Sequence, residues 1–170
     1  DVTLGQQLTD PGGRVRHAGS LALDGDQAEA EHLEPEVGTH ALEQRHVAGD
    51  RYAQVGLRGY WPGEEEFAWQ RERGITALRM REVLDRGIAD VLAEAIEAVG
   101  PGPAFASIDV DVLDPAFAPG TGTPEPGGMT SADLLWACRE LASQLELVGA
   151  DVVEVIPSAP LCVAPSVRCR

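Results

Sequence analysis

The sequence predicts an α/β fold with a mainly parallel sheet, and two observations carry this prediction. Short apolar runs of strand length alternate along the chain with segments whose apolar residues recur at helical spacing. Glycine, proline and charged residues mark the ends of these segments, in the positions where helices start and stop. Such alternation is typical of parallel α/β proteins, and 170 residues suffice for one domain with a hydrophobic core.

The clearest strand and helix lie near the middle of the chain. A buried strand is predicted over Tyr52–Leu57, followed by a helix over Glu64–Arg73. Three glutamates begin that helix, two arginines end it and Gly74 follows as a cap, an arrangement that complements the helix dipole. The next strand is expected over Thr76–Met80.

Two further helices and strands complete the pattern. Helical spacing predicts a helix over residues 88–99, and a Pro-Gly-Pro sequence separates it from a strand over Ala104–Ile108. Thr130 is expected to cap the following helix, with Asp133 near its third position. The last strand lies within Leu147–Ile156 and ends in Glu154. The buried face of the last helix is predicted to consist of Leu134, Leu135, Cys138, Leu141, Ala142 and Leu145.

The two ends of the chain carry weaker signals. Residues 1–20 show little periodicity, Leu21–Asp24 is consistent with a short buried strand, and residues 25–50 form an acidic, irregular segment. Prolines interrupt the C-terminal segment, so residues 159–170 are expected to be an irregular tail. We find no internal repeat and no linker, and therefore expect a single domain over residues 1–170.

Composition narrows the possible partners. The net charge of −15 argues against nucleic acid, because phosphate contact requires basic residues, but it is compatible with a cationic small molecule. No apolar run reaches the ~18 residues of a membrane span, and the start does not resemble a signal peptide. The three cysteines form no disulfide framework or zinc motif, so a reducing cytoplasm is the expected compartment.

The segment from Ser107 to Glu125 carries the strongest chemical signal. Asp109 and Asp111 end an apolar strand at i, i+2 spacing, so both side chains are expected to point the same way and converge on one spot. Two carboxylates so close repel unless a cation lies between them or one is protonated. Prolines and glycines then restrict the loop on both sides of Thr121 and Thr123. An isolated Asp-x-Asp is an ordinary loop sequence, so the longer string decides the interpretation.

That string, Ser107-Ile-Asp-Val-Asp-Val-Leu-Asp-Pro to Gly-Thr-Gly-Thr-Pro-Glu125, resembles the second metal motif of the ureohydrolase family, which includes arginase and agmatinase. Asp151–Pro157 resembles the later strand-end motif of that family, and Gln54–Gly59 resembles its central strand. The likeness is greatest to the agmatinase branch and covers residues 51–158 well, whereas residues 1–50 match poorly. It implies a three-layer α/β/α arginase-like fold, incomplete at the N-terminus, and a homo-oligomer.

The resemblance also implies the chemistry: two manganese ions activate water to hydrolyse a linear guanidino compound to urea and an amine. It assigns Asp109 and Asp111 as metal ligands, with Asp109 also catalytic. It places Thr123 beside the substrate and makes Glu154 the carboxylate that binds the guanidinium group, as a bidentate acceptor can. Asp114 is expected to close a turn rather than bind metal.

The other half of the family's metal site is poorly matched. Asp24 retains a ligand type and is assigned to the metal by the resemblance. Asp26 stands where a histidine is expected and is kept as a metal ligand, because a carboxylate also binds Mn²⁺, whereas Ala28 stands where an aspartate is expected. No Gly-Gly-Asp-His segment occurs. His40 is the nearest match to the family's proton-transfer histidine, although Gly38-Thr39-His40 reverses the family's His-Gly-Thr order.

Three hypotheses therefore stay open. The first is an agmatinase-like hydrolase acting on agmatine, arginine or a guanidino acid. The second is a catalytically impaired relative with an incomplete metal site, which binds a cation weakly or associates with an intact homologue. The third, a magnesium-dependent phosphatase using Asp109 and Asp111, accounts for the aspartates but leaves the Pro/Gly/Thr loop and Glu154 unexplained.

Overall fold

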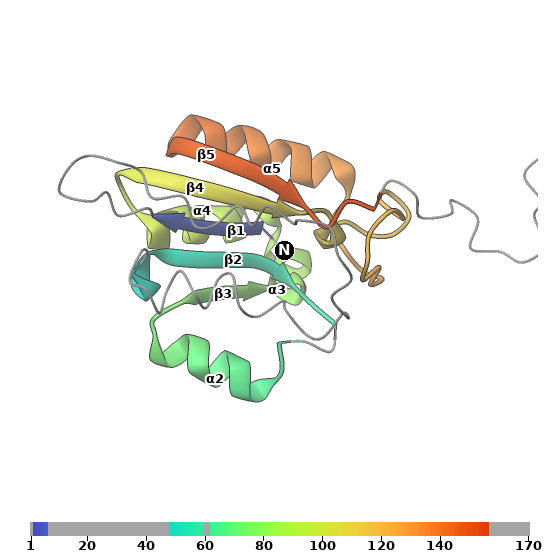
Figure 1. Cartoon of the computed structure of the whole chain (residues 1–170), viewed down its shortest axis with the longest axis horizontal. Coiled ribbons are helices and arrows are strands. Elements are labelled where there is room, and N and C mark those ends of the chain that lie inside the picture. Colours follow the sequence, from blue (N-terminus) through green and yellow to red (C-terminus); the bar gives the residue numbers. More distant parts are fainter. Residues whose placement is uncertain (1, 7–47, 60–61, 157–170) are drawn as a thin grey trace, which may run out of the picture.

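The computed structural model describes residues 2–6, 48–59 and 62–156. These residues form one five-stranded sheet with helices packed around it (Figure 1). The elements in chain order are β1 (Val2–Gln6), a 3-10 turn η1 (Gly49–Arg51), β2 (Tyr52–Leu57), α2 (Glu64–Glu72), β3 (Thr76–Arg79), α3 (Met80–Arg86), α4 (Ile88–Val99), β4 (Pro103–Asp109), a 3-10 turn η2 (Val110–Val112), α5 (Ser131–Gln144) and β5 (Glu146–Val153).

The sheet has the order β3-β2-β1-β4-β5, and all of these strands except β1 run in the same direction. The pairs β2–β3 and β4–β5 are parallel, whereas β1 is antiparallel to both of its neighbours, β2 and β4. Val2 pairs with Val55 on one side and with Ile108 on the other. The mainly parallel sheet predicted from the sequence is confirmed, and the C-terminal ends of β2, β4 and β5 meet at one edge.

The opposing central strand β1 was not predicted. Its residues lie in a stretch that shows little periodicity. Five residues are too few for an alternation of apolar and polar side chains that would predict a strand. Its place in the middle of the sheet, rather than its sequence, buries Val2 almost completely.

Helices cover both faces of the sheet. On one face, α4 packs against β2 and β1 and also contacts α3 and α5, and its buried residues Val91, Leu92 and Val99 join the core with Ala53 and Val55 of β2. On the other face, Tyr52 packs with Trp69 of α2, and Gln54 accepts a hydrogen bond from Gln70 of α2 at 2.9 Å. Because neighbouring strand residues point to opposite faces, α2 forms the third layer beside β2 and β3.

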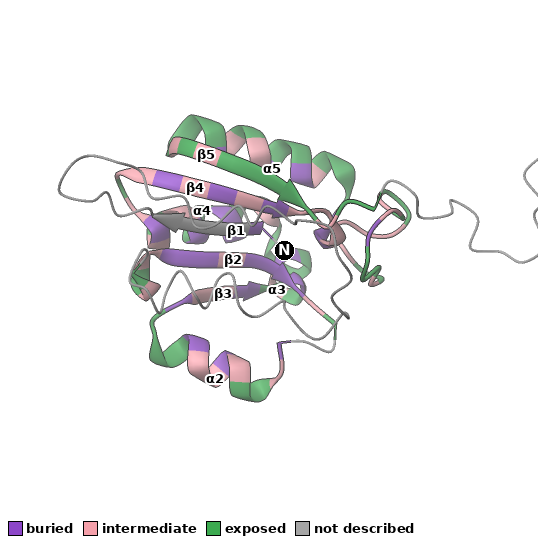
Figure 2. Ribbon diagram, viewed as in Figure 1, coloured by how far each residue is buried: buried purple, intermediate pink, exposed green. Residues whose placement is uncertain are grey.

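The outer strand β5 is less covered by the described residues. Most of β5 is exposed, as Figure 2 shows in green, with Val152 63% accessible to solvent. This edge strand therefore contrasts with β2, which is buried along nearly its whole length.

The predicted strands and helices within the described residues are confirmed, with corrections at the ends of two strands. The last strand was expected to end in Glu154, but β5 ends at Val153. Met80 was expected to end a strand, but it begins α3, because the Glu82 carboxylate accepts a hydrogen bond from the Arg79 backbone N–H at 2.8 Å and starts the helix there. On α5, the Thr130 cap with Asp133 is confirmed at 3.1 Å.

The predicted buried face of α5 is partly wrong. Leu135 is 57% exposed and Ala142 is also exposed, whereas Leu134, Ala137 and Leu141 are buried. The core-facing stripe follows the spacing of three and four residues through these positions, and Leu135 and Ala142 lie one residue away from it. Cys138 is half-buried on the same stripe, and burial raises the pKa of its thiol.

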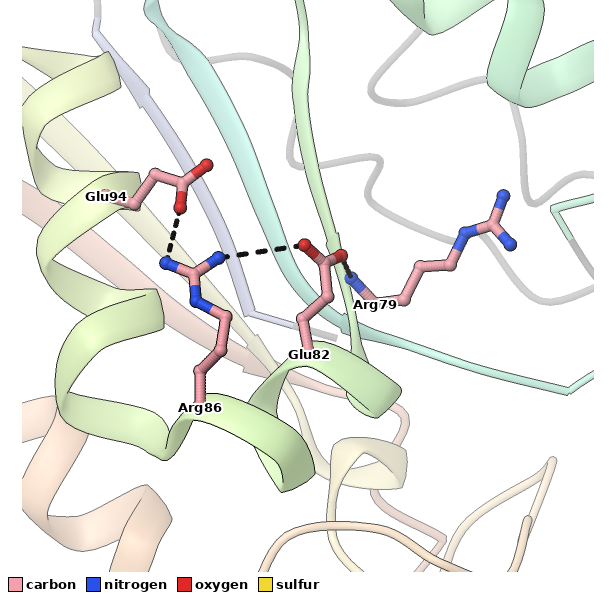
Figure 3. A network of polar contacts seen from close by, with 4 residues as sticks. All are labelled: Arg79, Glu82, Arg86 and Glu94. Carbon is pink, nitrogen blue, oxygen red and sulfur yellow. Dashed lines mark hydrogen bonds and ion pairs between the residues drawn. The ribbon is translucent and has the colours of Figure 1, made fainter.

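A chain of polar contacts joins α3 to the elements on either side of it (Figure 3). Arg86 contacts Glu82 at 3.7 Å and Glu94 of α4 at 2.6 Å, and Glu82 in turn binds the backbone of Arg79 at the end of β3. The Arg79 guanidinium turns away from this group and lies 3.8 Å from the centre of the Phe67 ring. The network is exposed, so its contribution to stability is small.

Several sequence predictions lie outside the described residues: the strand at Leu21–Asp24, most of the acidic segment and the C-terminal tail. In the part of the chain that the structure describes, no helix is long and apolar enough to cross a membrane.

Candidate functional site

The carboxylate pair lies where β4 ends, at the edge shared by the C-terminal ends of β2, β4 and β5. Asp109 is the last residue of β4, and Asp111 lies in the turn η2. The chain leaves the extended conformation between them, so the expectation of two side chains aligned along one strand is wrong. The turn brings them together instead: Asp109 Oδ1 accepts a hydrogen bond from the Asp111 N–H at 3.0 Å, and the two carboxyl groups interact directly.

The two carboxylates have different electrostatic surroundings. Burial raises the pKa of Asp109, and the neighbouring charge of Asp111 adds to that rise. Burial alone would also raise the pKa of Asp111, yet that pKa lies below its ordinary value, with the hydrogen bond from Thr123 Oγ1 at 2.7 Å among the causes. A half-buried pair that resists full ionisation is the arrangement that a bound cation would relieve.

Thr123 and Glu154 lie on two separate segments that a backbone hydrogen bond joins. Gly120 in the loop after β4 accepts a hydrogen bond from the Ile156 N–H at 2.8 Å, which ties that loop to the end of β5. Glu154 lies just after β5, and its Oε2 atom would lie 3.3 Å from a Cβ atom at Gly122. Thr123 therefore contacts Asp111, and Glu154 lies beside Gly122, the residue before Thr123 in the same loop.

Glu154 adopts an unusual backbone conformation. It has φ 58°, the left-handed region, where an L-residue other than glycine is strained. Such strain is characteristic of residues whose side chain is held in place for binding. The neighbouring Thr121 has a buried hydroxyl, 7% of the residue being exposed, with no hydrogen-bond partner among the described residues.

Asp114 closes the loop, as the sequence predicts. Its Oδ1 atom accepts a hydrogen bond from Ala116 N–H at 2.9 Å, and its Oδ2 atom accepts one from Gly127 N–H at 2.8 Å. These backbone hydrogen bonds hold the pKa of Asp114 below its ordinary value. Asp114 thus joins the two ends of a loop that contains Thr123.

Sequence reasoning missed Arg58, which follows β2 at the same edge. Its guanidinium donates hydrogen bonds to the backbone carbonyls of Asp111 at 2.6 Å, Leu113 at 3.2 Å and Glu125 at 2.6 Å. The sequence feature that could have identified it is a charged residue directly after a buried strand. A charge in that position requires a hydrogen-bond or ion-pair partner.

The residues present fit part of a metal site. Asp109 and Asp111 offer hard oxygen donors in a half-buried position, which suits manganese or magnesium. Within residues 2–6, 48–59 and 62–156, no third histidine, cysteine, aspartate or glutamate joins them in a group that could hold a metal. The other predicted site residues, Asp24, Asp26 and His40, lie outside the described residues.

Comparisons with known proteins identify a family. The model of the Arginase family matches residues 11–160. Guanidinopropionase from Pseudomonas aeruginosa is 52% identical over 119 residues, which cover 69% of this chain and 36% of that protein. Agmatinase from Salmonella paratyphi B is 45% identical over 105 residues, which cover 62% of this chain and 31% of that protein.

The fold agrees as well. The structure of proclavaminate amidino hydrolase from Streptomyces clavuligerus superposes with a TM-score of 0.65 and 36% identity, covering 71% of this chain and 40% of that one. The chain thus spans 36% of the length of the first curated relative and 31% of the second. With its arginase-like α/β fold and a family match over most of its length, the chain belongs to the arginase family.

Proposed function

We propose that the edge formed by β4 and β5 is part of a ureohydrolase active site, which hydrolyses a linear guanidino compound to urea and an amine. The observation that carries this proposal is that Asp109 and Asp111 lie together at the end of β4, with Thr123 bonded to Asp111 and Glu154 beside the same loop at Gly122. Family membership supports the same reaction class. It also leaves the phosphatase hypothesis without support.

Each residue has a role that its position suits. Asp109 and Asp111 would hold manganese, which when bound supplies Lewis-acid activation of a water molecule. The Glu154 carboxylate presents two acceptors that match the planar guanidinium group of a substrate. Thr123 donates to Asp111 and so orients that carboxylate while its own loop borders the substrate.

We propose a short guanidino acid as substrate, with agmatine as the second candidate. The relative at 52% identity is named a guanidinopropionase, whereas the agmatinase relative is at 45%. The net charge of −15 favours the approach of a cationic guanidino group in either case. A homo-oligomer, implied by the family, and a cytoplasmic location, inferred from the cysteines, stay predictions.

One observation favours a second candidate function, an impaired relative that binds a cation weakly. Two carboxylates are fewer protein ligands than a manganese pair requires, and no third ligand joins them among the described residues. Ala28 stands where the family has an aspartate, and a methyl group cannot bind metal.

Urea release from the purified chain with added Mn²⁺ tests the two against each other. We expect urea from 3-guanidinopropionate or 4-guanidinobutyrate faster than from agmatine, and no urea after Asp109→Ala. The matched control is Asp85→Ala, an exposed aspartate on α3 that pairs with Arg81 on the protein surface. Mn²⁺ binding without urea from any substrate would favour the impaired relative, and equal turnover by Asp109→Ala would contradict the assignment of Asp109.

A further inference from the structure

Arg58 is placed to control the shape of the loop that carries the site. It follows β2, yet it contacts residues 53, 55 and 67 positions further along the chain. Its Nη2 atom donates to three carbonyl oxygens, those of Asp111, Leu113 and Glu125, and its Nε atom also donates to Glu125 at 3.2 Å. Both the start and the far end of the loop are therefore attached to one side chain.

The chemistry of the contact favours an arginine. A guanidinium group is planar and always charged, and it presents several N–H donors in a fixed arrangement. Hydrogen bonds from a charged donor are stronger than neutral ones, and Arg58 is only partly exposed, which limits competition from water. A lysine ammonium also carries three N–H donors, but it lacks a second nitrogen to replace the Nε bond to Glu125 and the fixed planar geometry of the guanidinium group.

Two glycines show how closely the turn η2, which contains Asp111, packs against its neighbours. Gly56 forms a bulge in β2 with φ 93°, and a Cβ atom there would lie 2.6 Å from Val112 Cγ2. A Cβ atom on Gly128 would lie 2.4 Å from Asp114 N and 2.7 Å from Val112 O. The backbone around Asp111 is thus packed between β2 and the end of the loop, and its carbonyl is bound by Arg58.

We propose that Arg58 is a positioning residue that holds the Asp111 turn and the loop through Glu125 in the conformation that presents the metal carboxylates. The side chain of Asp111 leaves the backbone next to the carbonyl that Arg58 binds, so a change in that peptide redirects the carboxylate. The loop-holding role stands on the hydrogen bonds alone. The consequence for metal rests on the proposed function.

Arg51 provides a matched control. It also donates from its guanidinium to backbone carbonyls, to Val99 at 3.0 Å and to Pro101 at 2.8 Å, where it closes the C-terminal end of α4. It precedes β2, so it lies at the opposite edge of the sheet from the site. Arg51→Met and Arg58→Met remove equivalent groups from the two ends of one strand.

Hydrogen exchange measured by mass spectrometry tests the loop-holding role without metal. Several amides report on the loop, including those of Asp114 and Met129, which bond across its base. In the full chain we expect Arg58→Met to speed exchange over residues 110–129 by about tenfold, the change that loss of a charge-assisted hydrogen bond produces, and Arg58→Lys to have a smaller effect. Arg51→Met should speed exchange near the end of α4 only. Unchanged exchange over residues 110–129 in Arg58→Met, or an equal increase in Arg51→Met, would overturn the proposal.

A second readout concerns the metal. Mn²⁺ titration followed by electron paramagnetic resonance should show about 10–100-fold weaker binding in Arg58→Met, as for other residues that orient metal ligands, and unchanged binding in Arg51→Met. Equal affinity in Arg58→Met and the wild type would overturn the link to metal. Failure of the wild type to bind Mn²⁺ would instead contradict the proposed function and its link to metal, while the exchange result would still decide the loop-holding role of Arg58.

Discussion

The two edges of the sheet differ in how their polar groups are satisfied. At the edge where β2 begins, Arg51 closes α4, and its guanidinium donates to two backbone carbonyls. At the edge where β4 ends, two half-buried carboxylates lie together, Glu154 is strained, and the Thr121 hydroxyl is buried without a partner among the described residues. The first arrangement stabilises the fold, whereas the second costs stability, which is expected where a fold builds a binding site.

The largest expected effect on stability comes from the glycine beneath the site. Gly56→Ala forces a side chain into φ 93° and against Val112, so we expect a loss of about 2–4 kcal/mol in the free energy of unfolding, measured with urea. Gly87→Ala is the control, because Gly87 has a similar φ of 87° and a Cβ atom there would meet no atom within 4 Å. Its loss should be about 1 kcal/mol. Equal losses would show that the close contact between β2 and the turn η2 contributes nothing to the free energy of unfolding.

A smaller effect, of opposite sign, is expected at Glu154. Glycine tolerates φ 58° without strain, so Glu154→Gly should stabilise the chain by about 0.5–1 kcal/mol while removing guanidinium binding. Glu154→Ala removes the same carboxylate but keeps the backbone strain. Comparing the urea unfolding of the two variants therefore separates the effect of the strain from the effect of the carboxylate. A destabilised Glu154→Gly would mean that the Glu154 carboxylate stabilises the folded protein by more than the strained backbone at this position destabilises it.

The smallest effect is a shift in titration. Thr123→Val removes the hydrogen bond that helps to lower the pKa of Asp111, so that pKa should rise in the metal-free protein. A lowered pKa in the folded state stabilises the protein above the unfolded pKa, and this contribution is lost as the pH falls through the folded pKa. The variant should therefore lose stability at neutral pH relative to acidic pH. Carbon-13 NMR titration of the carboxyl groups measures the shift, and an unmoved Asp111 would show that Thr123 does not bind it in solution.

The sequence predicts most of the fold, because its elements carry local signals. The Thr130 cap, the helical spacing over residues 88–99 and the glycine and proline stops are all readable without tertiary information, and each is confirmed. The central strand β1 is not readable, since its burial comes from its neighbours. Leu135 was misassigned because an apolar residue adjacent to a buried stripe has no local feature that marks it as exposed.

The candidate site is predictable to a smaller extent. Asp109, Asp111, Thr123 and Glu154 were recognised through a family motif; in the structure Asp109 contacts Asp111, Thr123 bonds Asp111, and Glu154 lies beside Gly122. The means by which they converge could not be derived from spacing, since a 3-10 turn replaces the expected extended segment. Arg58 was missed because its partners are backbone carbonyls, which every residue possesses, and no residue type in the sequence marks them.

Binding of Mn²⁺ to the carboxylate pair tests the central claim most directly. Titration of the metal-free chain, followed by electron paramagnetic resonance, compares the wild type with Asp109→Ala and with the surface control Asp85→Ala. We predict saturable binding by the wild type and by Asp85→Ala, and affinity more than about 100-fold weaker in Asp109→Ala, because loss of a ligand exceeds the effect of losing a residue that orients one. Equal affinity in all three proteins would contradict the assignment of this edge of the sheet as a metal site.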